Sequence, residues 1–252
     1  ALYSNTTANN NTAIGESALI TNSTGAQNTA IGKDALSANT TASNNTAVGY
    51  QAGYSNQTGT NLTAIGYQAG YYNTASDNTF VGFSSGVGVT SGGANTFIGS
   101  AVGYATTTAA WNTGVGCQPL RFNTTGASNT AVGGQALYSN TTASNNTAVG
   151  YQAGYTNSTG TNLTCLGAYS LNGNTTGSQN VAIGSLALIN NTTGNNNVAV
   201  GSGVAGVSQG ALGQNTTGSN NTAVGYQAGY AITTGSKNTI LGGYTGNQGG
   251  LD

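Results

Sequence analysis

A repeat of 17 residues runs through the chain, and this period limits the choice of fold more than any other feature. The motif Asn-Thr-Ala-(Ile/Val)-Gly or a variant of it marks each repeat, and positions within a repeat are counted from its closing glycine. The closing glycines are Gly15, Gly32, Gly49, Gly66, Gly82, Gly99, Gly116, Gly133, Gly150, Gly167, Gly184, Gly201, Gly225 and Gly242. A fixed period of this kind is typical of architectures in which similar coils stack on one another.

Two intervals differ from the common spacing. Gly66 and Gly82 are 16 residues apart, and Gly201 and Gly225 are 24 residues apart. A deletion or insertion of this size fits in a loop corner, so we expect the stack to continue through both. The segment Ala35–Gly66 also returns nearly unchanged as Ala136–Gly167, which indicates that the array grew by duplication.

The composition of the repeat predicts strands and turns. A helix-turn-helix repeat needs about 34 residues, and glycine and asparagine favour tight turns because they tolerate positive φ. We expect two or three short strands per coil, each pairing in parallel with its copy about 4.8 Å away. The predicted fold is all-β, a parallel β-solenoid (β-roll or β-helix) of about 14–15 coils.

The alternation of residues in the motif predicts which side chains are buried. The residue before the closing glycine is Ile, Val or Leu, so we expect Ile14, Ile31 and Val48 to form one buried row. The residue two before the glycine, as in Ala47 and Phe80, then points outward. An outward apolar row indicates a partner surface and favours self-association, as a trimer or an end-to-end filament. A flattened coil with two thin cores is the alternative.

The repeat extends over the whole chain, so residues 1–252 are predicted to form a single β-solenoid domain. Irregular coils are expected near 86–93, 117–122 and 202–213, and Trp111 and Arg121 could form a local binding surface there. The first residues, Ala1–Thr7, match the middle of a coil, and residues 242–252 stop partway through another. We therefore expect a segment of a longer array.

Charged residues are scarce. The chain has three basic residues, four acidic residues and no histidine. Such a chain is poorly equipped for acid/base catalysis, for metal binding or for a basic nucleic-acid track. We predict that it is not an enzyme and needs no cofactor or nucleic acid. Without an apolar run of about 18 residues, membrane insertion of this segment is not expected either.

The motif Asn-Thr-Ala-(Ile/Val)-Gly resembles the Ser-Val-Ala-Ile-Gly repeat of trimeric autotransporter adhesin heads, which form left-handed parallel β-rolls. Leu137–Tyr155 is similar to repeat arrays of bacterial surface proteins and phage tail-fibre proteins. The resemblance implies a structural or adhesive fibre segment, located outside the cell, on the cell surface or on a virion. The repeat here is longer than that of the adhesin heads, so trimerisation and handedness are implied by resemblance only.

The sequence contains seventeen Asn-x-Ser/Thr sequons, which are acceptors for N-glycosylation. One row of them lies seven residues after the glycine. The candidate glycosylation sites in this row are Asn22, Asn39, Asn56, Asn123, Asn140, Asn157 and Asn174. The alternative is that these residues are stacked corner asparagines with inaccessible amides, because a chain rich in Asn and Thr makes sequons by chance.

Tyrosines form two rows, one and five residues after the glycine. The candidate interaction surface consists of Tyr50, Tyr54, Tyr67, Tyr71, Tyr151, Tyr155, Tyr226 and Tyr230. Tyrosine presents an apolar ring with a polar tip, so these rows could bind cell-surface glycans or pack against another chain. Simple stiffening of the surface is the alternative.

Threonine pairs, such as Thr40-Thr41 and Thr141-Thr142, recur eight and nine residues after the glycine. Regular threonine rows on a flat face are typical of ice-binding proteins, which gives the alternative function. Adjacent residues of a strand point to opposite faces, so each pair would leave only one row on a surface.

Overall fold

The computed structural model describes residues 1–204, 206 and 209–243. It shows an all-β, parallel β-solenoid of about 13 coils of about 17 residues, without a helix in the described part. The predicted fold class is confirmed. The partial coil expected after Gly242 lies mostly outside the described residues, as do positions 205, 207 and 208 of the irregular stretch 202–213.

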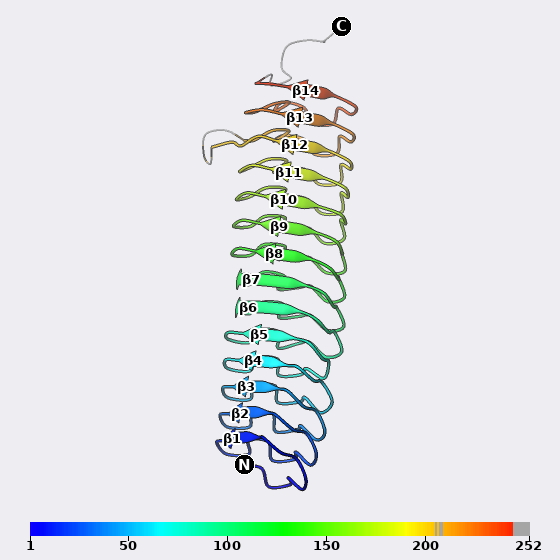
Figure 1. The fold of residues 1–252 in the computed structure, drawn as a ribbon. Helices are drawn as coiled ribbons and strands as arrows, with labels where there is room; N and C mark the ends of the chain where they lie inside the picture. Colours follow the sequence, from blue (N-terminus) through cyan, green and yellow to red (C-terminus); the bar gives the residue numbers. More distant parts are fainter. Residues whose placement is uncertain (205, 207–208, 244–252) are drawn as a thin grey trace. The chain divides into compact units, whose positions relative to one another are not determined.

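The chain divides into two compact units, Ala1–Ala127 and Ser128–Asp252. The first unit contains β1 (Thr12–Ile14), β2 (Thr29–Ile31), β3 (Thr46–Val48), β4 (Thr63–Ile65), β5 (Thr79–Val81), β6 (Thr96–Ser100) and β7 (Thr113–Cys117). The second contains β8 (Thr130–Val132), β9 (Thr147–Val149), β10 (Thr164–Leu166), β11 (Val181–Ile183), β12 (Val198–Val200), β13 (Thr222–Val224) and β14 (Thr239–Leu241). Within each unit the strands stack in sequence order (Figure 1).

Each strand pairs in parallel with the same motif positions of the next coil. In the first unit, for example, Ala30 pairs with Ala47 and Ile31 with Val48. The short interval leaves this register intact, because Thr63 pairs with Thr79. The long interval does so too, because Val198 pairs with Thr222. Both length changes are therefore absorbed outside the strands, as the sequence predicted.

In the described residues each coil forms one strand, so the expectation of two or three strands was wrong. The reason is the number of left-handed backbone positions, which interrupt an extended chain. In one coil these include Asn44 (φ 62°), Gln51 (φ 55°) and Gly53 (φ 58°). The turns between them still bond from coil to coil, as from the Leu36 amide to the Ala52 carbonyl oxygen at 3.0 Å.

The closing glycine has a structural role of its own. Gly49 has φ +137°, a conformation that side-chain-bearing residues rarely adopt. A Cβ atom built there would collide with the carbonyl oxygen of Gly66 in the next coil. This close approach of two backbones explains why glycine recurs at the same position in every coil.

The buried row of the strand is the opposite of the one predicted. The middle residue points inward, so Ala64 and Phe80 are 0% exposed. The residue before the glycine points outward, and Ile65 is 39% exposed. The prediction that Ile14, Ile31 and Val48 form a buried row was therefore wrong, as was the outward placement of the alanine row. A one-residue shift in a strand exchanges its two faces, and aliphatic character alone did not decide between them.

Side-chain volume explains the choice of inward residue. The coil interior is narrow, and in many coils a leucine four residues after the glycine, such as Leu36, fills it and leaves room for alanine at the strand. In the coils of Gly70 and Gly86, glycine stands at that leucine position and a larger residue comes in from the strand. Phe80 fills the space beside Gly70 and Gly86, and a Cβ at either glycine would clash with its ring. This complementarity is visible in the sequence and could have identified the inward row.

Two stacks of asparagine lie in the interior. The first, seven residues after the glycine, includes Asn157 and Asn174, and the Asn174 Nδ2 donates to the Asn157 Oδ1 at 2.8 Å. The second, four residues before the glycine, joins backbone to side chain, as where the Asn45 amide donates to the Asn28 Oδ1 at 3.0 Å. The same Asn28 donates through Nδ2 to the Ala42 carbonyl oxygen at 2.8 Å. Fully buried amides thus bridge one coil to the next.

Candidate interaction surfaces

The outward side of the strands forms a continuous surface in each unit, which we call the Thr–aliphatic face. It combines the residues three before and one before the closing glycine. In the first unit these are Thr12, Thr29, Thr46, Thr63, Thr79, Thr96 and Thr113, with Ile14, Ile31, Val48, Ile65, Val81, Ile98 and Val115. In the second unit they are Thr130, Thr147, Thr164, Val181, Val198, Thr222 and Thr239, with Val132, Val149, Leu166, Ile183, Val200, Val224 and Leu241.

This face is uncharged and carries an aliphatic row beside a row made mostly of threonines. The aliphatic side chains are half-buried or exposed at every strand. Among the described residues, none of the face threonines uses its hydroxyl group in a side-chain hydrogen bond, so the hydroxyls remain open to solvent or a partner. The described charged residues, Glu16, Lys33, Asp34, Asp77, Arg121 and Lys237, all lie elsewhere in their coils. Parallel rows of methyl and hydroxyl groups therefore run along each unit.

The seven candidate glycosylation sites are buried. Asn22, Asn39, Asn56, Asn123, Asn140, Asn157 and Asn174 are each 0% exposed. Each side-chain nitrogen donates to the backbone carbonyl oxygen three residues later, and some also donate along the asparagine stack, as from Asn39 to the Asn22 Oδ1 at 2.7 Å. A sugar on such a nitrogen would displace these bonds and needs space that the interior lacks. The geometry therefore favours the alternative interpretation, in which these residues are stacked structural asparagines with inaccessible amides. Other sequon asparagines, such as Asn44 and Asn145, are exposed at a turn.

The tyrosine rows lie on the surface, and most of their described members stack on one another. Tyr50, Tyr67 and Phe83 form one column, with neighbouring ring centroids 5.3 Å apart. Tyr54 stacks on Tyr71 at 5.0 Å, and Tyr138 on Tyr155 at 5.0 Å.

Three further tyrosines of the candidate interaction surface lie in the second unit. Tyr151 contacts Tyr169 edge to face, and the Tyr230 hydroxyl accepts a hydrogen bond from Gln214. Tyr226 is exposed. Because the stacked rings cover one another's faces, these columns offer mainly ring edges to a ligand.

The two threonines of a pair differ in burial: the first is half-buried and the second is exposed. The first threonine of a pair bonds to the next coil, as where the Thr175 Oγ1 donates to the Thr192 carbonyl oxygen at 3.0 Å. The second, such as Thr176, is exposed. Each pair leaves a single outward threonine row, whereas the Thr–aliphatic face carries two rows side by side.

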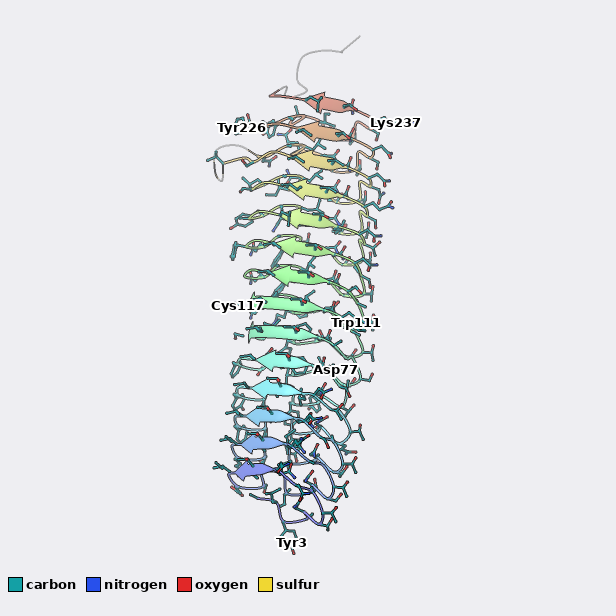
Figure 2. The ribbon with its side chains drawn as sticks, viewed as in Figure 1. Tyr3, Asp77, Trp111, Cys117, Tyr226 and Lys237 are labelled. Atoms are coloured by element: carbon teal, nitrogen blue, oxygen red, sulfur yellow. The ribbon has the colours of Figure 1, made fainter. Side chains whose placement is uncertain are left out.

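A shallow, open hollow of about 370 Å³ lies at one corner of the first unit. Its lining includes Asp77, Ala94 and Trp111, which occupy the same position, five residues before the glycine, in three successive coils. Trp111 is 71% exposed. Asp77 and Trp111 lie along the same edge of the unit, whereas Cys117 lies on the opposite edge (Figure 2). The sequence predicted that Trp111 could belong to a local binding surface. No motif in the sequence links Trp111 to Asp77, which lies 34 positions earlier.

Among the described residues, no group of three or more His, Cys, Asp or Glu side chains could hold a metal ion. The described part of the chain also contains no helix with the length and hydropathy needed to cross a bilayer. Both cysteines are free: Cys117 is exposed and Cys165 is buried. Burial raises the pKa of the Cys165 thiol to about 12.

No protein-family model, curated protein or solved structure matches this chain. The stacked parallel strands and the repeat alone therefore define the fold. What the chain does has to be inferred from its surfaces.

Proposed function

We propose that this chain is a non-enzymatic segment of an extracellular fibre that assembles laterally through its Thr–aliphatic face. The partner is a second copy of the same chain. The observation that carries the proposal is the half-exposed aliphatic row, represented by Ile31, Val48 and Ile65, which continues through every coil of each unit. A single soluble chain rarely exposes such a continuous apolar surface unless something covers it.

Several features favour a second copy as the partner. The face has no charged residue, and interface cores are depleted of charge in the same way. Its rows repeat at the strand spacing of about 4.8 Å, so another copy offers a matching row at every coil. Packing of two such faces would cover the aliphatic side chains and allow the threonine hydroxyls to bond across the interface.

The fibre role also fits the way in which the coils are held together. The interior relies on repeated hydrogen bonds between neighbouring coils, and additional coils extend such a stack without changing its design. The motif resemblance to adhesin heads and tail fibres points in the same direction. It supports a location outside the cell, on the cell surface or on a virion as part of the proposal.

The experiment is a measurement of native mass by light scattering coupled to size exclusion, with electron microscopy of the same sample. We expect a discrete oligomer, a trimer being the form that the resemblance implies, or laterally bundled filaments. A chain that stays monomeric at tens of micromolar would overturn the proposal.

Ice binding is a second candidate, and the Thr–aliphatic face favours it more than the threonine pairs do. Two parallel rows, one of hydroxyls and one of methyls, repeat at about 4.8 Å on a regular backbone. Such a surface could hold water in an ordered array against a crystal. Thermal hysteresis of the purified chain tests this directly: a gap between melting and freezing points, lost when Val48 and Ile65 are changed to lysine, would favour ice binding. Absence of the gap would remove this candidate.

A further inference from the structure

We propose that the hollow between Asp77 and Trp111 binds a pyranose sugar. This site gives the fibre segment an adhesive function and uses a surface separate from the Thr–aliphatic face. Its lining is Ala75, Ser76, Asp77, Ser91, Gly93, Ala94, Ala110 and Trp111.

The hollow exists because of small residues in the middle coil. Asp77 and Trp111 are separated by two coil steps, or about 10 Å at the spacing of paired strands. Between them lie Gly93 and Ala94, whose coil bonds directly to both neighbours: the Ala94 amide donates to the Ser76 carbonyl oxygen, and the Trp111 amide to that of Gly93. Other coils carry longer residues at this position, such as Gln27 and Gln179. Ala94 is the smallest residue at this position in the chain, so the floor is low here.

Trp111 supplies an aromatic wall. Its backbone is left-handed, with φ 62°, which places the residue at the tip of a turn. No other aromatic ring stacks on it in the described part of the chain, in contrast to the tyrosine columns. A free indole ring can pack against the apolar C–H side of a sugar ring while the sugar's hydroxyls remain hydrated.

Asp77 supplies the polar contact on the other side. The Asn61 Nδ2 donates to the Asp77 Oδ1 at 2.9 Å, which orients the exposed carboxylate. A carboxylate is a strong acceptor for hydroxyl groups, and two neighbouring hydroxyls of a sugar suit its two oxygens. The hollow's volume of about 370 Å³ lies at the small end of ligand sites, which suits one sugar unit.

The chain contains one tryptophan, so its emission reports on this site alone. The probes are methyl glucoside, methyl galactoside, methyl mannoside and N-acetylglucosamine, each titrated to about 100 mM, because a small ligand in a shallow site binds in the millimolar range. We expect a saturable change in emission with at least one of them. No saturable change with any of the four would overturn the proposal.

Three variants sharpen the test, each with melting temperature as a check on folding. Asp77→Asn keeps the shape of the side chain and should weaken binding about tenfold or more. Ala94→Gln fills the floor with a residue that other coils accept and should abolish binding. Asp34→Asn removes a carboxylate outside the hollow and should change nothing.

The same assay distinguishes a sugar from a cation, which a carboxylate beside an aromatic ring could also attract. Choline is the cationic probe. Saturation by choline without saturation by any sugar would overturn the assignment. The result is also separate from the assembly proposal: a monomer that binds a sugar refutes assembly alone, and an oligomer that binds none refutes this site alone.

Discussion

The side-chain nitrogen of Asn174 donates a hydrogen bond to the Asn157 Oδ1 at 2.8 Å, and both residues are fully buried. Asn157 in turn donates to the Asn140 Oδ1 at 3.0 Å and to the Gly160 carbonyl oxygen at 2.9 Å. Each amide therefore serves as donor and acceptor in a line that crosses successive coils. Polar groups form a large part of this interior, where a larger domain would use aliphatic residues.

Asn157→Asp should destabilise the chain strongly. It removes the two donors of the buried amide and places a negative charge where no cation lies nearby. We expect a loss of about 3 kcal/mol or more in the free energy of unfolding at pH 7. Chemical denaturation followed by circular dichroism measures it. The matched control is Asn162→Asp at an exposed turn, which should shift stability by less than about 0.5 kcal/mol. Equal effects of the two variants would contradict a structural role for the stack.

Side-chain volumes at the strand and at the turn compensate one another in the core. This predicts that substitutions at the two positions have non-additive effects on the free energy of unfolding. Phe80→Ala alone should cost about 3–5 kcal/mol, because a fully buried ring leaves a cavity. Gly86→Leu alone should also destabilise, since the added side chain would meet the Phe80 ring. The double variant reproduces the combination of Ala30 with Leu36, the buried residues at the same two positions of another coil, and should recover much of the loss. Additive losses in a double-mutant cycle would refute this packing account.

The two cysteines should react very differently with thiol reagents. Burial raises the pKa of Cys165 to about 12, so its thiolate is scarce at pH 8, whereas Cys117 is exposed. We expect one reactive thiol per chain with Ellman's reagent in native buffer and two in denaturant. Cys117→Ser should then leave none in native buffer. A second fast-reacting thiol in the native chain would show that the coil interior around Cys165 is not closed.

The same pKa shift links stability to pH. Burial favours the neutral thiol in the folded state. Its contribution to the free energy of unfolding is therefore fully present below the ordinary thiol pKa of 9.0. It is lost progressively as the pH rises from about 9 toward 12. Cys165→Ala should flatten the alkaline part of the stability profile. An unchanged profile would contradict the raised pKa.

The repeat period was sufficient to predict the stack, the parallel pairing and the place of the length changes. Each of these follows from identical residues recurring at a fixed interval. The inward row was predicted wrongly because Ala47 and Val48 are both apolar, and their order of hydrophobicity does not say which one fits a narrow interior. The occurrence of the large Phe80 together with Gly70 and Gly86 does indicate which strand residue points inward. The indication lies in side-chain volumes that compensate one another, not in hydrophobicity.

Single positions in the candidate surfaces were harder to predict than the repeat. The Asn39 and Asn44 sequons look alike as motifs, yet one side chain lies in the interior stack and the other on an exposed turn. Only the path of the backbone separates them. The hollow at Trp111 also needs residues of the two coils before it. One of these residues, Ala94, carries no sequence motif that would mark it, because its only contribution is a small side chain.

The most direct test of the central claim is the native mass of a variant with three charges on the Thr–aliphatic face. Val48→Lys, Ile65→Lys and Val81→Lys combine on adjacent strands at positions that are already partly exposed, so the coil should still fold. The control carries Thr24→Lys, Thr41→Lys and Thr58→Lys, which add the same charge at exposed turns. Light scattering should show an oligomer for the wild type and the control, and a folded monomer for the face variant. Equal masses for the wild type and the face variant would contradict assembly through this surface.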